Sequence, residues 1–460
     1  MKTLNHYTLF IIICTLPYLN YAQWDTTQVL DSQGNVGLYV SMQIVDGYPA
    51  VAYYHNQDRE LRYMRATDPD GRNWGSPVVV AVGGRYASMA VVNNKPAIAY
   101  FSKTGENLMF VRASNPQGTS WGTPMTLDAP GSVGHYISLD TITGAPAISY
   151  FDATNFNLKY IRAIDAAGTN WNSPVTVVSS SGWVGQYTSL EEVNNNPAIS
   201  YYNREEERFE YIRATDGVGN NWGSPVVVDD SIPSSFHSHT SLAVVNGNPA
   251  IAYHDDDNQD LKYVRATNEN GTSWGTPVRV DSINNTGDGP SLAVVNGKPA
   301  IAYNKGSGSR PYYVQALNNT GSAWGTPEKF FDVTSTSWYY SLLEVNGKAA
   351  IAYYVLGSGD LNYIQNESSS LNKTNISLKE LQSGFSLYPN PAGDELIIQL
   401  GSSSPKDNLY IIDLRGKVIY SAKLKNLEQH RIDVSDFLPG AYILTLEGTS
   451  GKYQARWSKE

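Results

Sequence analysis

Short segments in which apolar and polar residues alternate fill most of the chain, and no long stretch shows the 3.6-residue period of a helix. At residues 241–253, SLAVV and NPAIAY lie on either side of Asn246-Gly247. Asn-Gly between alternating runs predicts a tight β-hairpin, because both turn residues must adopt a positive φ. The pattern therefore predicts an all-β protein built of short strands.

The same hairpin returns at regular intervals along the chain. The sequence PAIAY or a close variant begins at Pro49, Pro96, Pro146, Pro197, Pro249, Pro299 and Ala349. At a constant distance after the first six copies stand Trp74, Trp121, Trp171, Trp222, Trp274 and Trp324. Each unit of about 50 residues is predicted to hold four strands, which is typical of a β-propeller blade.

The seventh unit lacks the tryptophan segment that would form its fourth strand. Trp24 opens a segment of the same kind, WDTTQVLD, before the first unit. If this segment completes the seventh blade, the ring closes and leaves no exposed sheet edge. The chain resembles a seven-bladed β-propeller with Velcro closure, which we predict over residues 23–366.

The turn before each tryptophan, such as ATDPDGRNW at residues 66–74, resembles the Asp box of sialidase-like propellers in a degenerate form. Asp68, Asp165 and Asp216 stand one residue farther from the tryptophan than the motif requires. In that family the box is a folding element away from the active site. The resemblance implies a structural turn, with the tryptophan packed between the third and fourth strands.

The first residues predict an export signal. Lys2 precedes the apolar run YTLFIIICTLPYL at residues 7–19, and Ala22 offers a small residue for cleavage, so residues 1–22 are predicted to be a signal peptide. The apolar run is too short to span a membrane. Cys14, the single cysteine, lies within it, so the mature chain is expected to hold no disulfide and no transmembrane segment.

The composition changes after the seventh unit. Residues 367–384 are polar and predict a linker, and residues 385–460 predict a small C-terminal β-sandwich of strands separated by Gly and Pro turns. The motifs YPNP at 388–391, DLRGK at 413–417 and LPGAY at 438–442 closely resemble the type A C-terminal sorting domain of the type IX secretion system of Bacteroidota. The resemblance implies that the secretion machinery is a partner, and that the protein passes through the periplasm to the outer cell surface or the medium.

Charge and motifs limit the classes of function. The formal net charge of −10 argues against nucleic-acid binding, which needs clustered Lys and Arg. The sequence contains no nucleophile elbow, HExxH motif or phosphate-binding glycine loop, and no cofactor is expected. We therefore expect a binding protein. Catalytic carboxylate pairs have no sequence signature, so a polysaccharide hydrolase or lyase stays open as an alternative.

Only the loop between one blade's tryptophan and the next blade's first strand varies in length. Propellers place these loops on one face together with the loops between the second and third strands. We call this end of the propeller the loop face. Variable loops on a rigid scaffold usually carry binding, so we expect a glycan or another extracellular polymer to bind there. A protein-docking surface for adhesion is the third alternative.

Counting back from the hairpin turns predicts cross-strand aromatic pairs near the loop face. The predicted pairs are Tyr39–Tyr54, Tyr86–Phe101, Tyr136–Phe151, Tyr187–Tyr202 and Tyr339–Tyr354, with His239–His254 in blade five and Gly289–Asn304 in blade six. These side chains form either a layer packed between blades or platforms for sugar rings. Trp183 and Trp338 stand outside the repeat pattern. The candidate ligand-binding residues are Trp183, Tyr187, Tyr202, Trp338, Tyr339, Tyr354, His239 and His254.

The histidines also raise the question of a metal. Imidazoles bind Zn²⁺ and Cu²⁺ well, but no third blade offers a ligand at the level of His239 and His254, and histidine also fits an aromatic layer. The run HDDDNQD at residues 254–260 lacks the alternating pattern of a calcium loop. We expect no metal site.

Overall fold

The computed structural model describes residues 24–230, 239–306, 308–331, 336–366, 385–388, 392–400, 408–413, 418–424, 429–438, 440–448 and 451–459. The predicted signal peptide, residues 1–22, and the predicted linker, residues 367–384, lie outside them. The chain divides into two compact units, residues 1–369 and 370–460. No helix in the described ranges has the length and apolar character needed to cross a membrane.

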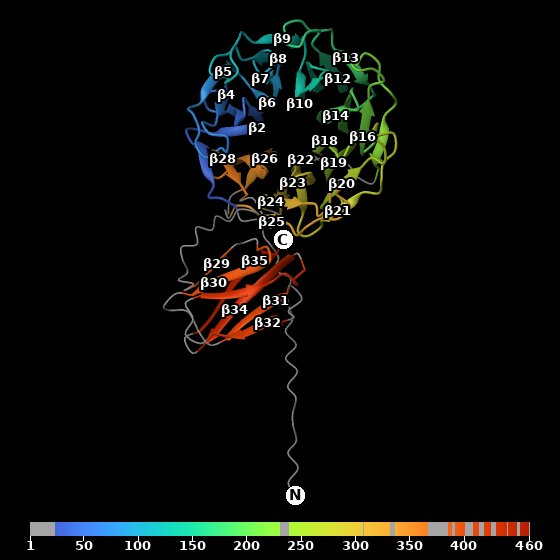
Figure 1. Ribbon diagram of the computed structural model, residues 1–460. Helices are drawn as coiled ribbons and strands as arrows, with labels where there is room; N and C mark the ends of the chain where they lie inside the picture. Colours follow the sequence, from blue (N-terminus) through green and yellow to red (C-terminus); the bar gives the residue numbers. More distant parts are fainter. Residues whose placement is uncertain are drawn as a thin grey trace. The chain divides into compact units, whose positions relative to one another are not determined.

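The described part of the first unit holds seven antiparallel sheets of four strands, arranged in a ring (Figure 1). Each sheet is one blade, with strands A to D running outward from the centre. The A strands are β2 (Val36–Val45), β6 (Arg85–Val92), β10 (Val133–Ile142), β14 (Val184–Val193), β18 (Thr240–Val245), β22 (Thr286–Val295) and β26 (Ser337–Val345). The B strands are β3 (Tyr48–His55), β7 (Lys95–Ser102), β11 (Ala145–Asp152), β15 (Asn196–Asn203), β19 (Asn248–Asp255), β23 (Lys298–Lys305) and β27 (Lys348–Val355).

The outer half of each blade is formed by strands C and D. The C strands are β4 (Glu60–Arg65), β8 (Asn107–Arg112), β12 (Asn157–Arg162), β16 (Arg208–Arg213), β20 (Asp260–Arg265), β24 (Arg310–Gln315) and β28 (Asp360–Gln365). The D strands are β5 (Val78–Val82), β9 (Met125–Asp128), β13 (Val175–Val178), β17 (Val226–Asp229), β21 (Val278–Asp281), β25 (Glu328–Lys329) and β1 (Gln28–Asp31).

Strand β1 from the start of the chain completes blade seven. It pairs with β28, and Gln28 lies opposite Tyr363. The backbone N–H of Asp25 donates to the carbonyl of Gln365 over 2.8 Å, and Trp24 forms an isolated bridge with Asn366. The predicted Velcro closure is therefore confirmed, and the propeller has seven blades.

The core of the propeller lies between neighbouring blades. One cluster joins Ala52 and Tyr63 of blade one to Met89 and Ile98 of blade two, and the other blades pair in the same way. Burial of such apolar faces is the main force that holds the ring together.

The repeated tryptophan contributes to this packing between blades. Its backbone bridges strands C and D of its own blade, as Trp222 does with Ala214. Its ring contacts the aromatic residue of strand C in the preceding blade, as Trp222 does with Tyr160 at 5.2 Å between centroids. The predicted position between strands C and D therefore holds for the backbone alone, because the ring packs edge-on against the strand-C aromatic residue of the preceding blade.

The second unit contains two sheets. One is β29 (Phe385–Tyr388), β30 (Glu395–Leu400) and β33 (Gln429–Asp433), and the other is β32 (Val418–Lys423), β31 (Asn408–Asp413), β34 (Gly440–Gly448) and β35 (Gly451–Lys459). Leu396 and Ile398 of the first sheet share one buried core with Leu409 and Leu444 of the second. The predicted β-sandwich is confirmed.

Candidate functional site

Each A strand except β18 carries a register irregularity close to the loop face. At this point Tyr39, Tyr86, Tyr136, Tyr187 and Tyr339 have φ between 51 and 57°. Gln186, not Tyr187, lies opposite Tyr202, and Trp338, not Tyr339, lies opposite Tyr354. The predicted cross-strand pairs are therefore wrong, because a β-bulge shifts the register by one residue. The corrected partners in the other blades are Leu38–Tyr54, Arg85–Phe101, His135–Phe151 and Asp288–Asn304.

The bulged tyrosines contact one another around the inner side of the propeller. The ring centroids lie 4.6 Å apart for Tyr339–Tyr39, 4.8 Å for Tyr39–Tyr86, 5.2 Å for Tyr86–Tyr136, 4.3 Å for Tyr136–Tyr187 and 4.2 Å for Tyr187–His239. We call these six residues the aromatic arc. Burial, together with neighbouring tyrosines, raises the pKa of Tyr86 and Tyr339, so these two hydroxyls stay neutral.

The aromatic arc is interrupted in blade six, where Gly289 occupies the equivalent position. Gly289 has φ +60°, close to the value of the arc tyrosines, and a Cβ added there would meet no described atom within 4 Å. The backbone therefore keeps the conformation of the other blades, while the side chain is missing. On one side of this gap stands His239. The A–B ladder of blade five begins at Thr240–Tyr253, so the predicted His239–His254 pair lies outside it.

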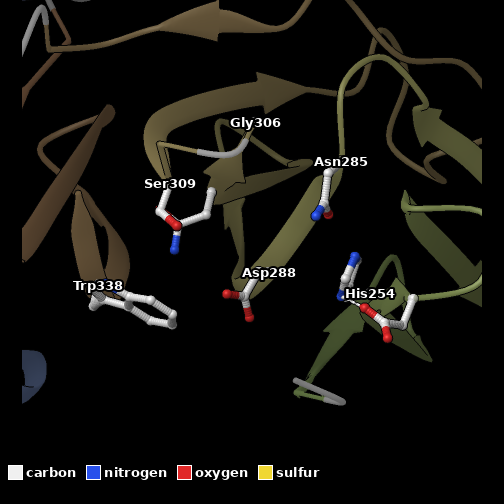
Figure 2. Close-up of a pocket in the computed structure, with 8 residues that line it drawn as sticks. His254, Asn285, Asp288, Gly306, Ser309 and Trp338 are labelled. Atoms are coloured by element: carbon white, nitrogen blue, oxygen red, sulfur yellow. Dashed lines mark ion pairs between the residues drawn. The ribbon is translucent and has the colours of Figure 1, made fainter. Parts of the chain in front are cut away.

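A cavity of about 290 Å³ lies at the loop face beside this gap, between blades five, six and seven (Figure 2). It is lined by His254, Asp256, Asn285, Asp288, Asn304, Gly306, Ser309 and Trp338. These residues stand at the start of strand A, at the end of strand B, or in the adjoining loops. Trp338 and His254 lie on opposite sides of the cavity, with Asp288 between them (Figure 2). We call it the blade-six cavity.

Polar groups dominate the blade-six cavity. The His254 Nδ1 lies 3.8 Å from an Asp256 carboxylate oxygen, and the His239 Nδ1 lies 3.5 Å from Asp288. Asn304 is 3% exposed, and its Oδ1 accepts a hydrogen bond from the Tyr340 hydroxyl. Its Nδ2 has no hydrogen-bond partner among the described residues. A buried amide donor without a partner is costly, so a ligand oxygen that reaches Asn304 gains an interaction.

The other candidate residues lie in different surroundings. Tyr202 and Tyr354 are buried, with 0% and 3% of their surface exposed. Tyr202 belongs to the core cluster between blades four and five. Trp183 is 38% exposed, and its ring stacks on Phe156 at 4.9 Å with the Arg204 guanidinium 5.2 Å away. The structure thus brings His254 and Trp338 together in the cavity, and places Tyr187, Tyr339 and His239 in the aromatic arc. Trp183 does not line the cavity.

Sequence reasoning missed Asn285, Asp288, Asn304 and Ser309. The available signal was the break at Gly289–Asn304, where blade six departs from the aromatic pattern of its neighbours. Within the described ranges, no group of three or more His, Cys, Asp or Glu side chains is placed to hold a metal ion.

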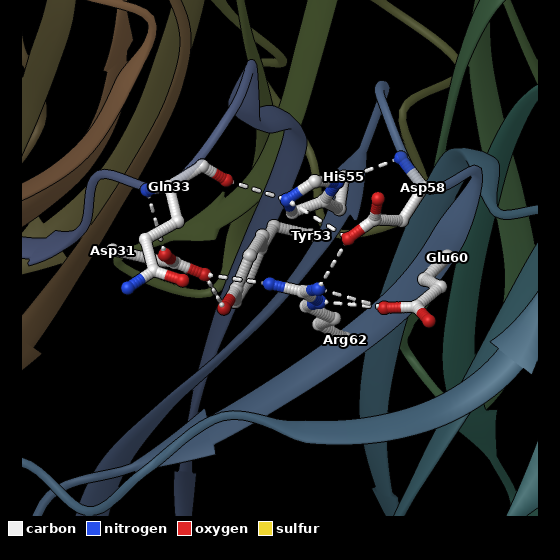
Figure 3. A network of polar contacts seen from close by, with 7 residues as sticks. All are labelled: Asp31, Gln33, Tyr53, His55, Asp58, Glu60 and Arg62. Atoms are coloured by element: carbon white, nitrogen blue, oxygen red, sulfur yellow. Dashed lines mark hydrogen bonds and ion pairs between the residues drawn. The ribbon is translucent and has the colours of Figure 1, made fainter.

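A second cavity, of about 430 Å³, lies beside strand β1 and is lined in part by Asp31, Gln33 and Arg62. It adjoins a polar network in which the Tyr53 hydroxyl donates to Asp31 over 2.7 Å and Arg62 contacts Asp31, Asp58 and Glu60 (Figure 3). Equivalent contacts join Tyr150 to Asp128 and Tyr303 to Asp281. Because the same contact recurs in several blades, we assign this network to the scaffold.

The sequence comparison concerns the second unit. Residues 386–460 match the family described as the secretion system C-terminal sorting domain. The second unit is a sorting domain of this family. Its Tyr442 hydroxyl donates to the carbonyl of Leu438, which joins two residues of the LPGAY motif. The sorting domain marks the protein for the type IX secretion system, so the protein is secreted or carried on the outer cell surface.

The propeller resembles several solved structures. The NanB sialidase of Streptococcus pneumoniae is 12% identical with a TM-score of 0.43, and the match covers 77% of this chain and 72% of that chain. YCF48 bound to D1 peptide is 14% identical with a TM-score of 0.49, over 76% and 99% of the two chains. The fucose-specific lectin of Aleuria aurantia is 11% identical with a TM-score of 0.43, over 65% and 96%. No curated protein sequence matches the chain.

Proposed function

We propose that the protein binds carbohydrate at the loop face of the propeller, outside the cell, and does not transform it. The observation that carries the proposal is the blade-six cavity, which combines the indole of Trp338 with amide, hydroxyl and carboxylate groups. An apolar surface beside a few polar groups is the usual composition of a small-molecule site.

The chemistry of a sugar fits this combination. One face of a pyranose ring is covered by C–H groups, and an aromatic ring packs against such a face. The ring edges carry hydroxyls, which bond to side chains such as those of Asn285 and Ser309. Delivery by the sorting domain places the loop face among extracellular polymers.

Trp183 offers a second contact surface on the same face. Its indole is partly exposed, in a loop that the repeat does not require. A polymer bound in the cavity and at Trp183 would contact two separated places on the loop face, and two linked contacts raise the apparent affinity.

One observation favours hydrolysis as a second candidate. Asp256 and Asp288 both line the blade-six cavity, and glycosidases use a pair of carboxyl groups. Analysis of the saccharide after long incubation separates the two functions, because hydrolysis creates reducing ends and binding does not.

The test is a glycan array with the purified propeller, followed by calorimetry and product analysis on the saccharides retained. We expect binding, unchanged saccharide, and a loss of about 1–3 kcal/mol of binding free energy in Trp338→Ala, by analogy with nucleobases that stack on aromatic side chains. Folded protein that retains no saccharide would overturn the proposal, and new reducing ends would favour the hydrolase.

A further inference from the structure

We infer that the Gly289 gap in the aromatic arc makes the blade-six cavity a specificity site for one uncharged sugar residue, bound through neighbouring hydroxyls. This inference rests on the proposed carbohydrate function and names the site and the class of ligand.

The gap is not required by the backbone. A glycine inside a strand lowers stability, because it loses more conformational freedom than other residues and packs no side chain. At Gly289 the φ of +60° is one that tyrosine adopts in five other blades, and a Cβ would have free space around it. Neither strain nor crowding explains the glycine, while an open cavity does.

Asn304 changes together with Gly289. It holds the strand-B position that is aromatic in blades one to four and seven, as at Tyr354. Its ladder partner Asp288 occupies a position that varies between blades, from Leu38 to Arg85. Blade six thus has a glycine and an amide in place of two aromatic side chains, with a carboxylate beside them. Asp288 and Asn304 both line the blade-six cavity, and Gly289 directly follows Asp288 in the strand.

The polar groups select the chemistry of the ligand. The Asn304 Nδ2 is a buried donor without a partner among the described residues, so it needs an acceptor from the ligand. Each carboxylate of Asp256 and Asp288 can accept several hydrogen bonds, so it can take a ligand donor in addition to the histidine beside it. An ammonium group only donates and a carboxylate only accepts, whereas a hydroxyl does both. Neighbouring hydroxyls of a sugar satisfy both kinds of group.

The charge of the cavity excludes acidic sugars. Two carboxylates line it, and the lining residues in the described part of the chain include no Lys or Arg. A uronic acid or sialic acid would bring a third negative charge beside Asp256 and Asp288, and like charges in one site repel strongly. Trp338 and His254 stand on opposite sides of Asp288 (Figure 2), so a sugar bound to Asp288 lies between an indole and an imidazole.

The deciding variant fills the gap. A tyrosine introduced at residue 289 is expected to follow the arc tyrosines, whose rings lie 6.2 Å from the strand-B residue in Tyr86–Phe101 and Tyr136–Phe151. In this direction the new ring would lie beside Asn304, the strand-B residue of blade six. Gly289→Tyr should therefore close the cavity while it extends the arc.

The matched control lies in the same hairpin. Gly297 sits in the A–B turn with φ +71° and free space at Cβ, and the equivalent residues of blades two and four are Asn94 and Asn195, also at positive φ. Gly297→Asn makes a comparable change at the far end of β22 and β23, away from the cavity residues.

The probes are methyl glycosides of glucose, galactose and mannose, with glucuronic acid as the charged probe, measured by calorimetry and ligand-observed NMR on the full mature chain. Wild type and Gly297→Asn should bind at least one methyl glycoside and bind glucuronic acid at least about tenfold more weakly. Gly289→Tyr should lose roughly tenfold or more in affinity, with a melting temperature no lower than that of the control.

Asp288→Asn provides an independent test if Gly289→Tyr folds poorly. It keeps the size of the side chain and removes one negative charge, so the preference for methyl glycosides over glucuronic acid should shrink.

A folded Gly289→Tyr that binds as well as wild type, or an unchanged preference in Asp288→Asn, would overturn the inference. If binding is instead lost in Trp183→Ala alone, the proposed function stands and the inference falls. If wild type binds no saccharide, the proposed function itself fails.

Discussion

The two ends of each blade differ in how strictly they repeat. At the C–D turn, six tryptophans donate from Nε1 to the carbonyl of the glycine three residues earlier, over 2.8–2.9 Å. At the loop face, the position of the aromatic arc holds Tyr in five blades, His in blade five and Gly in blade six. The adjoining loops also differ in length. The comparison teaches that repetition marks what ring closure requires, and that a break in repetition marks a place where a function can reside.

The largest expected effect comes from breaking the repeated architecture itself. Deletion of residues 24–31 removes β1, leaves β28 as an open edge and strips Asp31 from Tyr53 and Arg62. We expect a loss of about 4 kcal/mol or more in the free energy of unfolding, measured by urea denaturation. The control is the chain that begins at residue 23. Equal denaturation midpoints for the two chains would show that β1 does not close the ring.

The next effect compares a repeated tryptophan with a non-repeated one. Trp222→Ala removes a ring packed on Tyr160 and its bond to Gly219, and should cost about 3 kcal/mol of stability without changing saccharide affinity. Trp183→Ala removes a ring that is 38% exposed and should cost less than about 1.5 kcal/mol. Thermal melts and calorimetry on both variants make the comparison. A larger loss of stability in Trp183→Ala would assign that residue to the scaffold.

A smaller effect tests the aromatic arc. Tyr136 lies between Tyr86 and Tyr187, so Tyr136→Ala should cost about 2 kcal/mol through lost ring contacts. Tyr136→Gly removes one carbon more, yet it relieves about 1 kcal/mol of strain at φ 51°. We therefore expect the glycine variant to unfold at the same urea concentration as the alanine variant, or a higher one. A clearly less stable glycine variant would mean that the bulge is not strained.

The smallest effect concerns the C–D turns and acid. Desolvation raises the pKa of Asp165, but hydrogen bonds from Thr169, Asn170 and Ala167 together outweigh it and lower the pKa to about 2. A lowered folded pKa means that the contribution of Asp165 is present above its unfolded pKa, near 4, and is lost as the pH falls through about 2.

Asp165→Asn should therefore lose less than about 1 kcal/mol at pH 7, and this loss should shrink as the pH falls from 4 toward 2, measured by thermal melts between pH 7 and pH 2. Asn268 occupies the same position in blade five, so Asn268→Asp should gain the pH dependence that Asp165→Asn loses. Identical pH profiles for all three proteins would show that the turn carboxylates do not contribute.

Much of the fold was predictable because its signals are local. Asn246-Gly247 specifies a tight turn, the alternation on either side specifies the strands, and counting the tryptophans shows that the last blade needs Trp24. None of these steps depends on how distant blades pack. Likewise, the YPNP and LPGAY motifs are short and continuous, so the sorting domain was readable from the sequence.

The candidate site was less predictable because it depends on packing. The bulge at Tyr187 adds one residue to the strand, and a hydrophobic pattern read at a constant period of two does not show it. The cavity collects His254, Asp288 and Trp338 from three blades, and no local signal links them. Sequence reasoning selected His254 and Trp338 as departures from the repeat, but it did not treat Gly289 as a departure of the same kind.

Closure by β1 has a mechanical consequence. The propeller ends at Gln365 of β28, and the chain continues from there toward the sorting domain. Because β1 pairs with its outer side, β28 is hydrogen-bonded to a strand on each side, β27 and β1. An edge strand under tension can peel away one hydrogen bond at a time, whereas a strand held on both sides must break two ladders. When a protein attached through its C-terminal part is pulled from outside, tension at the exit point thus acts on two ladders instead of one.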